Sequence, residues 1–177
     1  YELIERVVKN DKKIRFSIKT IEGRSTLIRA NQGHSIKHVQ LSQLCVRLME
    51  RLPVGYGCRH GSYIHYTRSI REEGLIAGGK DEFEGEEQKR NMIHLVMTRD
   101  SEPGSQRILG MRHDCQTVIV IDINRAIDDG IEFYQTRNGS IVTQGRNGIL
   151  PPEYILDIHS VKHKVIISSP GEELPID

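Results

Sequence analysis

The run from Thr117 to Ile123 constrains the fold of this chain most, because nearly continuous β-branched residues are typical of a buried strand. A second apolar run, Met92 to Thr98, predicts another buried strand. Shorter strands are predicted around the turns Asn138-Gly139 and Asn147-Gly148 and near the C-terminus, over 132–134, 141–143, 154–158 and 161–167. The second part of the chain is therefore expected to be rich in strands.

The first part of the chain shows a different pattern. Residues 1–9 read as the end of an amphipathic helix with no capping residue ahead of it, so we expect that a segment precedes Tyr1. Strands over 15–20 and 26–30 predict a hairpin. Helices are predicted over 39–52, ending before Pro53, and over 63–73, with Gly74 just beyond the C-terminus. Residues 77–89, rich in Gly and Glu, predict an exposed loop.

Composition narrows the class of protein. A chain of 177 residues can bury a core as one domain or two small lobes without cross-links. The three cysteines are far apart and form no Cys-x-x-Cys pair, which favours a reducing, intracellular setting over a disulfide framework or a zinc site. No apolar run approaches the roughly 18 residues of a membrane span, and the first residues do not resemble a signal peptide.

The charge is distributed unevenly along the chain. Residues 1–71 carry 14 Lys and Arg against 5 Asp and Glu, whereas the remainder carries 11 against 19, and the net charge is only +1. A basic N-terminal part beside an acidic one is typical of a lobe that binds a polyanion joined to a second lobe. A solvated charged face explains the same pattern equally well.

Two polar clusters place imidazoles beside glycines: Arg29-Ala-Asn-Gln-Gly-His-Ser35 and Cys58-Arg-His-Gly-Ser62. Glycine lets the backbone approach a ligand closely, and loops that flank strands often carry binding residues. His60 is followed by Gly61 and Ser62 at a predicted helix N-terminus, which would offer free N–H groups to an anion. Alternatively, each histidine only satisfies neighbouring carbonyl groups.

Basic side chains supply candidate phosphate ligands. Lys13 and Arg15 are two residues apart, so on a strand they would share a face and hold a phosphate together. Arg90 and Arg112 are candidates for a cleft beside the buried strands. The alternative for each is an ordinary surface position. The histidine spacings do not fit a zinc site, and neither a Rossmann nor a Walker glycine pattern is present.

These motifs together resemble the tRNA 2'-phosphotransferases. The resemblance rests on their order along the chain: Lys13-Ile-Arg-Phe16, Arg29 to Ser35, His60-Gly-Ser62, Arg90 to Leu95 and Pro151-Pro-Glu-Tyr154. It implies an α+β fold in which a partial N-terminal winged-helix-like lobe, residues 1–52, precedes an ADP-ribosyltransferase-like lobe, residues 53–177. The first lobe would be truncated at its start, where the family carries a Leu-Arg-His motif.

The resemblance also assigns roles to individual residues. Arg15 and Arg90 would be catalytic, and His60, Gly61, Ser62 and Arg112 would bind NAD+. The RNA and its phosphate would be bound by the basic and polar residues Lys13, Arg29, Gln32, His34 and Ser35. From the histidine spacings we expect no metal ion.

The implied reaction moves an internal RNA 2'-phosphate, such as that of a tRNA splice junction, onto NAD+. The products would be RNA with a free 2'-hydroxyl, ADP-ribose 1'',2''-cyclic phosphate and nicotinamide, formed by a monomer in the cytoplasm or nucleus. Two alternatives remain open at this point: an ADP-ribosyltransferase that stops after modifying an RNA phosphate, and a non-catalytic module that binds RNA or ADP-ribose. The second alternative is favoured if Ser62, Met92 and Val96, where the family commonly has other residues, mark a decayed site.

Overall fold

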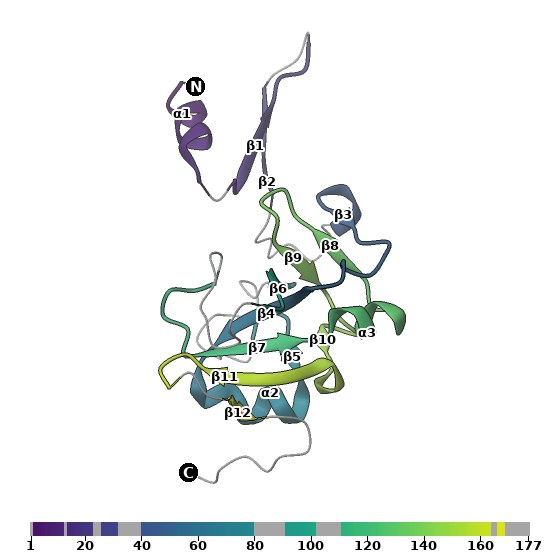
Figure 1. Cartoon of the computed structure of the whole chain (residues 1–177). Coiled ribbons are helices and arrows are strands. Elements are labelled where there is room, and N and C mark those ends of the chain that lie inside the picture. The colour runs from purple at the N-terminus through teal and green to yellow at the C-terminus, as the bar shows by residue number, and fades with distance from the viewer. Residues whose placement is uncertain are drawn as a thin grey trace.

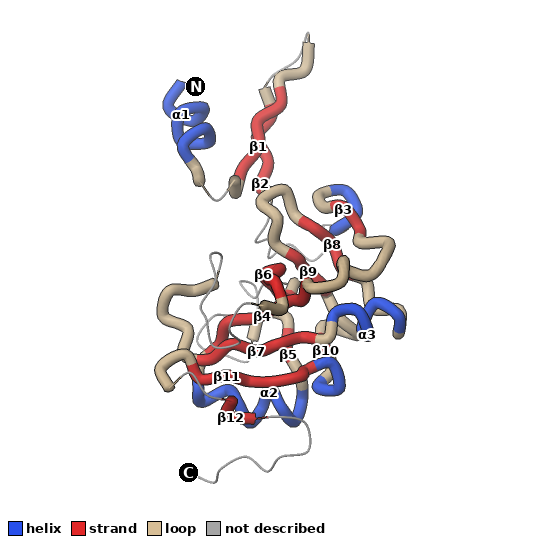
Figure 2. The backbone as a smooth tube through the Cα atoms, viewed as in Figure 1, coloured by secondary structure: helices blue, strands red, loops and turns tan. Residues whose placement is uncertain are grey.

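The computed structural model describes residues 2–12, 14–22, 26–31, 40–79, 91–101, 111–163 and 166–168. The chain begins with helix α1 (Glu2–Asn10), followed by the antiparallel hairpin of β1 (Phe16–Lys19) and β2 (Leu27–Ala30). Figures 1 and 2 show this helix and hairpin standing apart from the rest of the chain. The helix and hairpin predicted from the sequence are thus confirmed. Among the described residues, no helix combines the length and apolar character needed to cross a membrane.

The body of the molecule is an eight-stranded sheet with the order β12-β11-β7-β4-β6-β9-β8-β3. All the pairings between its described strands are antiparallel. The strands are β3 (Val46–Arg47), β4 (Tyr56–Ser62), β6 (Ile93–Arg99), β7 (Thr117–Ile121), β8 (Phe133–Gln135), β9 (Ile141–Thr143), β11 (Ile155–Ser160) and β12 (Ile166–Ser168). A mixed α and β fold with a large antiparallel sheet is therefore confirmed, while its division into winged-helix-like and ADP-ribosyltransferase-like lobes stays a prediction.

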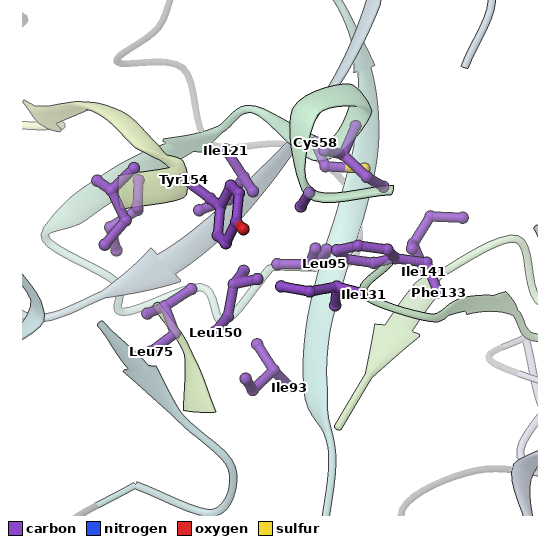
Figure 3. Close-up of a cluster of buried hydrophobic side chains, with 14 of the residues drawn as sticks. Cys58, Leu75, Ile93, Leu95, Ile121, Ile131, Phe133, Ile141, Leu150 and Tyr154 are labelled. Carbon is purple, nitrogen blue, oxygen red and sulfur yellow. The ribbon is translucent and has the colours of Figure 1, made fainter. Parts of the chain in front are cut away.

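Helices and a small second sheet cover the large sheet. The short strands β5 (Leu75–Ile76) and β10 (Ile149–Leu150) pair with each other, and α2 (Thr67–Glu73) and α3 (Ile123–Asp128) contribute buried apolar side chains. Three 3-10 turns complete the described elements: η1 (Leu41–Gln43), η2 (Ile64–Tyr66) and η4 (Pro152–Tyr154). Figure 3 shows the resulting core, in which Leu95, Phe133 and Ile141 gather beside Tyr154 and Leu150. All five side chains are buried.

The central strand β7 explains why its sequence signal was strong. It lies between β4 and β11, and Thr117, Val118 and Ile119 are fully buried. A strand covered on both faces needs apolar residues at consecutive positions rather than at alternate ones. The prediction of a buried strand here is confirmed.

One predicted element is wrong, and a second is displaced along the chain. Residues 39–52 do not form a helix: within the described part, 40–52, the chain makes the turn η1 and then β3, where Val46 lies opposite Gln135 of β8. The edge of β8 satisfies the backbone of this segment, and such a distant partner overrides local periodicity. The strand predicted over 161–167 is instead a turn at 161–163 and the short strand β12. Because β3 pairs with β8, residues 46–47 belong to the large sheet although they were expected in the first lobe.

Candidate active site

The large sheet opens between β4 and β6. The first part of β4 pairs with β6 up to Arg59, which lies opposite Val96. Beyond that pair β6 continues along β9, with His94 opposite Val142, while β4 continues along β7. The two strands therefore part at the residue that follows Arg59, which is His60.

His60 is held at this opening by a backbone carbonyl. Its Nδ1 lies 2.8 Å from the carbonyl oxygen of His94. Since a carbonyl can only accept, Nδ1 carries the hydrogen, and in the neutral ring Nε2 keeps a lone pair for a ligand. Burial lowers the pKa of His60, the bond to His94 acts in the opposite direction, and the positive charge of Arg112 lowers it further. The ring is thus neutral near pH 7.

The sequence prediction for the neighbours of His60 is wrong in one respect. Gly61 and Ser62 do not stand at a helix N-terminus: they belong to β4, where they lie opposite Val118 and Thr117 of β7. Helix α2 begins only at Thr67. The N–H groups of these two residues therefore lie in the strand rather than in an anion site built by a helix end.

Gly61 has a different structural role. A Cβ atom at this position would lie 3.1 Å from Cys115 Sγ and 3.4 Å from Met111 Cβ. The distance to Cys115 is tighter than nearly all real Cβ contacts, so a side chain here would press the segment 111–115 away from β4. That segment carries Arg112 and thereby brings its guanidinium toward His60.

Arg112 is held beside His60 by a short polar chain. Its Nη1 donates to the hydroxyl oxygen of Tyr63 at 3.3 Å, and that hydroxyl donates to Asp114 Oδ2 at 2.8 Å. The hydrogen bond from Tyr63 is the main reason that the pKa of Asp114 is lowered, so its carboxylate remains charged. We call His60, Tyr63, Arg112 and Asp114 the His60 cluster. It combines a neutral acceptor with an exposed cation, a set that suits ribose hydroxyls and phosphate oxygens.

A second polar site surrounds Arg15 at the base of the N-terminal hairpin. Asp11 accepts the backbone N–H of Arg15 at 2.7 Å and the side-chain Nε at 3.1 Å. Ile14, directly before Arg15, has φ of +50°, which is a rare conformation for a β-branched residue. The buried Asn31 holds this bend, since its Nδ2 donates to Ile14 O at 2.9 Å and its backbone N–H donates to Arg15 O at 2.7 Å. Asn31 and Asp11 together fix the backbone that presents Arg15.

The strand expected to carry Lys13 and Arg15 on one face does not include Arg15, because β1 begins at Phe16. Lys13 lies outside the described residues. Arg15 instead lines an open groove with Arg6 and Lys12 from α1 and the chain that follows it. Three basic side chains along one groove suit the phosphates of a nucleic acid. The side chain of Arg15 is 57 % exposed and accessible to such a ligand.

The remaining candidates are placed only in part. Arg29 is exposed on β2. Burial raises the pKa of the Cys45 thiol, and the positive charge of Arg29 offsets part of this rise. Gln32, His34, Ser35 and Arg90 lie outside the described residues, so their roles stay predictions. Among the residues with described placement, no three His, Cys, Asp or Glu side chains are grouped to hold a metal ion. Sequence reasoning missed Asp11, Asn31 and Tyr63, although Asn31 stands inside the Arg29 to Ser35 motif.

Comparisons with known proteins connect both sites to one family. Residues 1–145 match the family described as "RNA 2'-phosphotransferase, Tpt1 / KptA family". The chain is 37% identical over 156 residues to a tRNA 2'-phosphotransferase 1 of Danio rerio, and the match covers 85% of this chain and 62% of that protein. It is 34% identical over 168 residues to a putative tRNA 2'-phosphotransferase of Schizosaccharomyces pombe, covering 95% of this chain and 42% of that protein.

A bacterial relative gives the same result at lower identity. The chain is 30% identical over 141 residues to a probable RNA 2'-phosphotransferase of Escherichia coli, covering 80% of this chain and 64% of that protein. In these three comparisons the match spans between 42% and 64% of the length of the relatives. The family match includes both the Arg15 site and the His60 cluster.

Proposed function

This chain belongs to the RNA 2'-phosphotransferase, Tpt1/KptA family, and we propose that it transfers an internal RNA 2'-phosphate to NAD+. The products are RNA with a free 2'-hydroxyl, ADP-ribose 1'',2''-cyclic phosphate and nicotinamide. A tRNA with a phosphorylated splice junction is the substrate we infer. The single observation that carries the proposal is the family match over residues 1–145, which includes both polar sites.

The Arg15 site binds the RNA in this proposal. A guanidinium holds phosphate oxygens by parallel hydrogen bonds, and Arg15 has its Nε side against Asp11 and a largely exposed side chain. The bound backbone of Ile14 and Arg15 limits how far the guanidinium can move. Arg15 therefore orients the 2'-phosphate, and Arg6 and Lys12 in the same groove attract the neighbouring phosphates. Arg90 is the second phosphate ligand in the proposal.

The His60 cluster binds NAD+. When bound, NAD+ supplies the ribose carbon that accepts the phosphate and nicotinamide as the leaving group. Neutral His60 offers Nε2 as an acceptor for a ribose hydroxyl, because its Nδ1 hydrogen points to His94 O. Arg112 offers a cation for the pyrophosphate oxygens, held there by Tyr63. Both groups are held before the ligand arrives, which lowers the entropic cost of binding it.

The test is an assay of NAD+-dependent phosphate release from a short RNA with one internal 2'-phosphate. We expect release by the wild-type chain, and a loss of roughly 10²- to 10³-fold for Arg15→Ala, the magnitude typical of removing one hydrogen-bond donor to a developing charge. Arg112→Ala should raise the KM for NAD+. Arg68→Ala is the matched control, because Arg68 is an exposed arginine of α2 that pairs with Glu72.

Three outcomes contradict parts of the proposal. Accumulation of ADP-ribosylated RNA without phosphate release would indicate a transferase that stops at the first step. NAD+ binding without any turnover would indicate a binding module. Wild-type rates for Arg15→Ala would remove that residue from the site while leaving the reaction itself in place.

A further inference from the structure

The side chain of Arg137, on the turn between β8 and β9, reaches the N-terminal hairpin and hydrogen-bonds to it. Arg137 Nη1 donates to the hydroxyl oxygen of Ser17 in β1 at 3.0 Å, across 120 residues of sequence. Arg137 stands on the turn between β8 and β9, where the Gly139 N–H donates to Thr136 O at 3.0 Å and the Thr136 N–H donates to Ser140 O at 2.9 Å. Arg137 therefore lies on a hydrogen-bonded turn that joins two strands of the eight-stranded sheet.

The hydrogen bond from Arg137 is the first of a chain of hydrogen bonds in the hairpin that all donate in the same direction. The Ser17 hydroxyl accepts from Arg137 and donates to Asn31 Oδ1 at 2.7 Å. The other end of the same carboxamide, Nδ2, donates to Ile14 O at 2.9 Å. Each group in the chain accepts at one side and donates at the other, an arrangement in which neighbouring hydrogen bonds strengthen one another. It also fixes which way the amide of Asn31 points.

The last acceptor in this chain is the backbone carbonyl of Ile14, and the backbone conformation of Ile14 determines where the Arg15 side chain points. Ile14 has φ of +50°, a conformation in which a β-branched residue is strained. Such a conformation persists only where surrounding contacts hold it, and the bond from Asn31 is one of these contacts. If the carboxamide of Asn31 loses its orientation, Ile14 can relax and the guanidinium of Arg15 moves with the backbone.

We propose that Arg137 is a positioning residue which, through Ser17 and Asn31, holds Arg15 in the orientation that binds the RNA 2'-phosphate. The role for the phosphate rests on the proposed function, whereas the mechanical connection rests on the hydrogen bonds alone. Arg137 itself touches no reacting atom in this proposal. Its guanidinium connects the sheet that carries the His60 cluster to the hairpin that carries Arg15. The two halves of the site therefore keep their positions relative to each other.

The mechanical connection is tested by amide hydrogen exchange of the whole chain. In Arg137→Ala and in Ser17→Ala we expect faster exchange in peptides from 14–22 and 26–31, with unchanged exchange in β4, β6 and β7. Ser17→Thr keeps the hydroxyl and should keep the protection. Arg68→Ala, in which another exposed arginine is lost, should match the wild type. Unchanged exchange of the hairpin in both alanine variants would overturn the proposal.

The consequence for the reaction is tested by steady-state kinetics on the 2'-phosphorylated RNA. Arg137→Ala should lower kcat/KM for the RNA by roughly ten- to a hundredfold, the scale on which small misplacements of a catalytic group act. The KM for NAD+ should stay unchanged, because the His60 cluster is not touched. The double variant Arg137→Ala with Ser17→Ala should lose no more than either single variant, since both break one chain of contacts.

The two proposals fail in different ways. If the wild-type chain releases no phosphate, the proposed function fails, and hydrogen exchange alone still decides whether Arg137 holds the hairpin. If the wild type is active and Arg137→Ala loses activity only through a higher KM for NAD+, or if the double variant loses the product of both single effects, the positioning role is overturned while the proposed function stands.

Discussion

The N-terminal unit, meaning the described part of residues 2–31, differs from the large sheet in what holds it together. Helix α1 buries none of its residues, and Phe16 of the hairpin is 39 % exposed. In the sheet, Phe133 is 0 % exposed within one continuous apolar cluster. The sheet is therefore stabilised by buried apolar area, whereas the N-terminal unit depends on polar contacts around Asn31 and Asp11.

This difference has a consequence for the proposed site, because its two parts stand on supports of unequal strength. The His60 cluster is attached to strands in the middle of the sheet, next to the core. Arg15 is attached to a segment with little buried area, and such segments open with low free energy. Hydrogen bonds are directional but individually weak, so the orientation of Arg15 is more sensitive to single substitutions than that of His60.

The same substitution, Phe to Ala, should change the free energy of unfolding by very different amounts in the sheet and in the hairpin. Phe133→Ala should lower the free energy of unfolding by about 3–5 kcal/mol, because it leaves a cavity in the core. Phe16→Ala should lower it by less than about 1 kcal/mol, as for a surface position. Urea unfolding followed by circular dichroism measures both. Equal losses would mean that the hairpin shares the core of the sheet.

The sequence predicts the two regions to different extents, and the reason is physical. The strand at Thr117 to Ile121 and the hairpin are local patterns, visible in consecutive residues. The helix expected over 39–52 was wrong because Val46 and Arg47 pair with β8, which lies far along the chain. The hydrophobic periodicity of a segment does not show which distant strand it will pair with. For a short segment, that pairing determines the secondary structure.

The same limit applies to the candidate site. His60, Gly61 and Arg112 were selected as candidate ligands, yet Gly61 lies in β4, where it gives room to the segment that carries Arg112, and not at a helix N-terminus. The link between Arg137 and Ser17 joins residues 120 positions apart and left no local signal. Chemistry-bearing residue types can therefore be found from sequence, whereas the contacts that orient them need the fold.

A second pair of variants sharpens the comparison inside the sheet region, where packing should dominate. Gly74 and Gly139 have φ of +91° and +84°, so alanine is strained at either position, and more so at Gly74, whose ψ of −172° lies in a region essentially reserved for glycine. A Cβ at Gly74 would also overlap Leu150 O of β10, whereas nothing lies within 4 Å at Gly139. Gly74→Ala should therefore be the more destabilising by at least about 1 kcal/mol in urea unfolding. Equal losses would show that neither the ψ angle of Gly74 nor its overlap with Leu150 O adds to the cost of a positive φ.

Lowering the pH should reduce the stability of the sheet slightly, through His60, without loosening the N-terminal hairpin. Burial lowers the pKa of His60 below its ordinary value of 6.5, so the unfolded chain binds its proton more tightly than the folded one. The resulting stability is complete above about pH 6.5 and is lost as the pH falls toward the folded pKa. His159 is shifted in the same direction by burial, so His60→Gln should remove only part of the loss on acidification, and His159→Gln supplies the comparison.

Residues 2–31 contain no histidine, which makes the hairpin an internal control for this pH effect. Urea midpoints measured from pH 8 to pH 5 should fall less in His60→Gln than in the wild type, because glutamine does not titrate and its amide can still donate to His94 O. Hydrogen exchange of the hairpin, corrected for the intrinsic pH dependence, should not change over that range. If acidification loosens the hairpin as much as it destabilises the sheet, the two regions unfold together, and Arg15 and His60 then share one support.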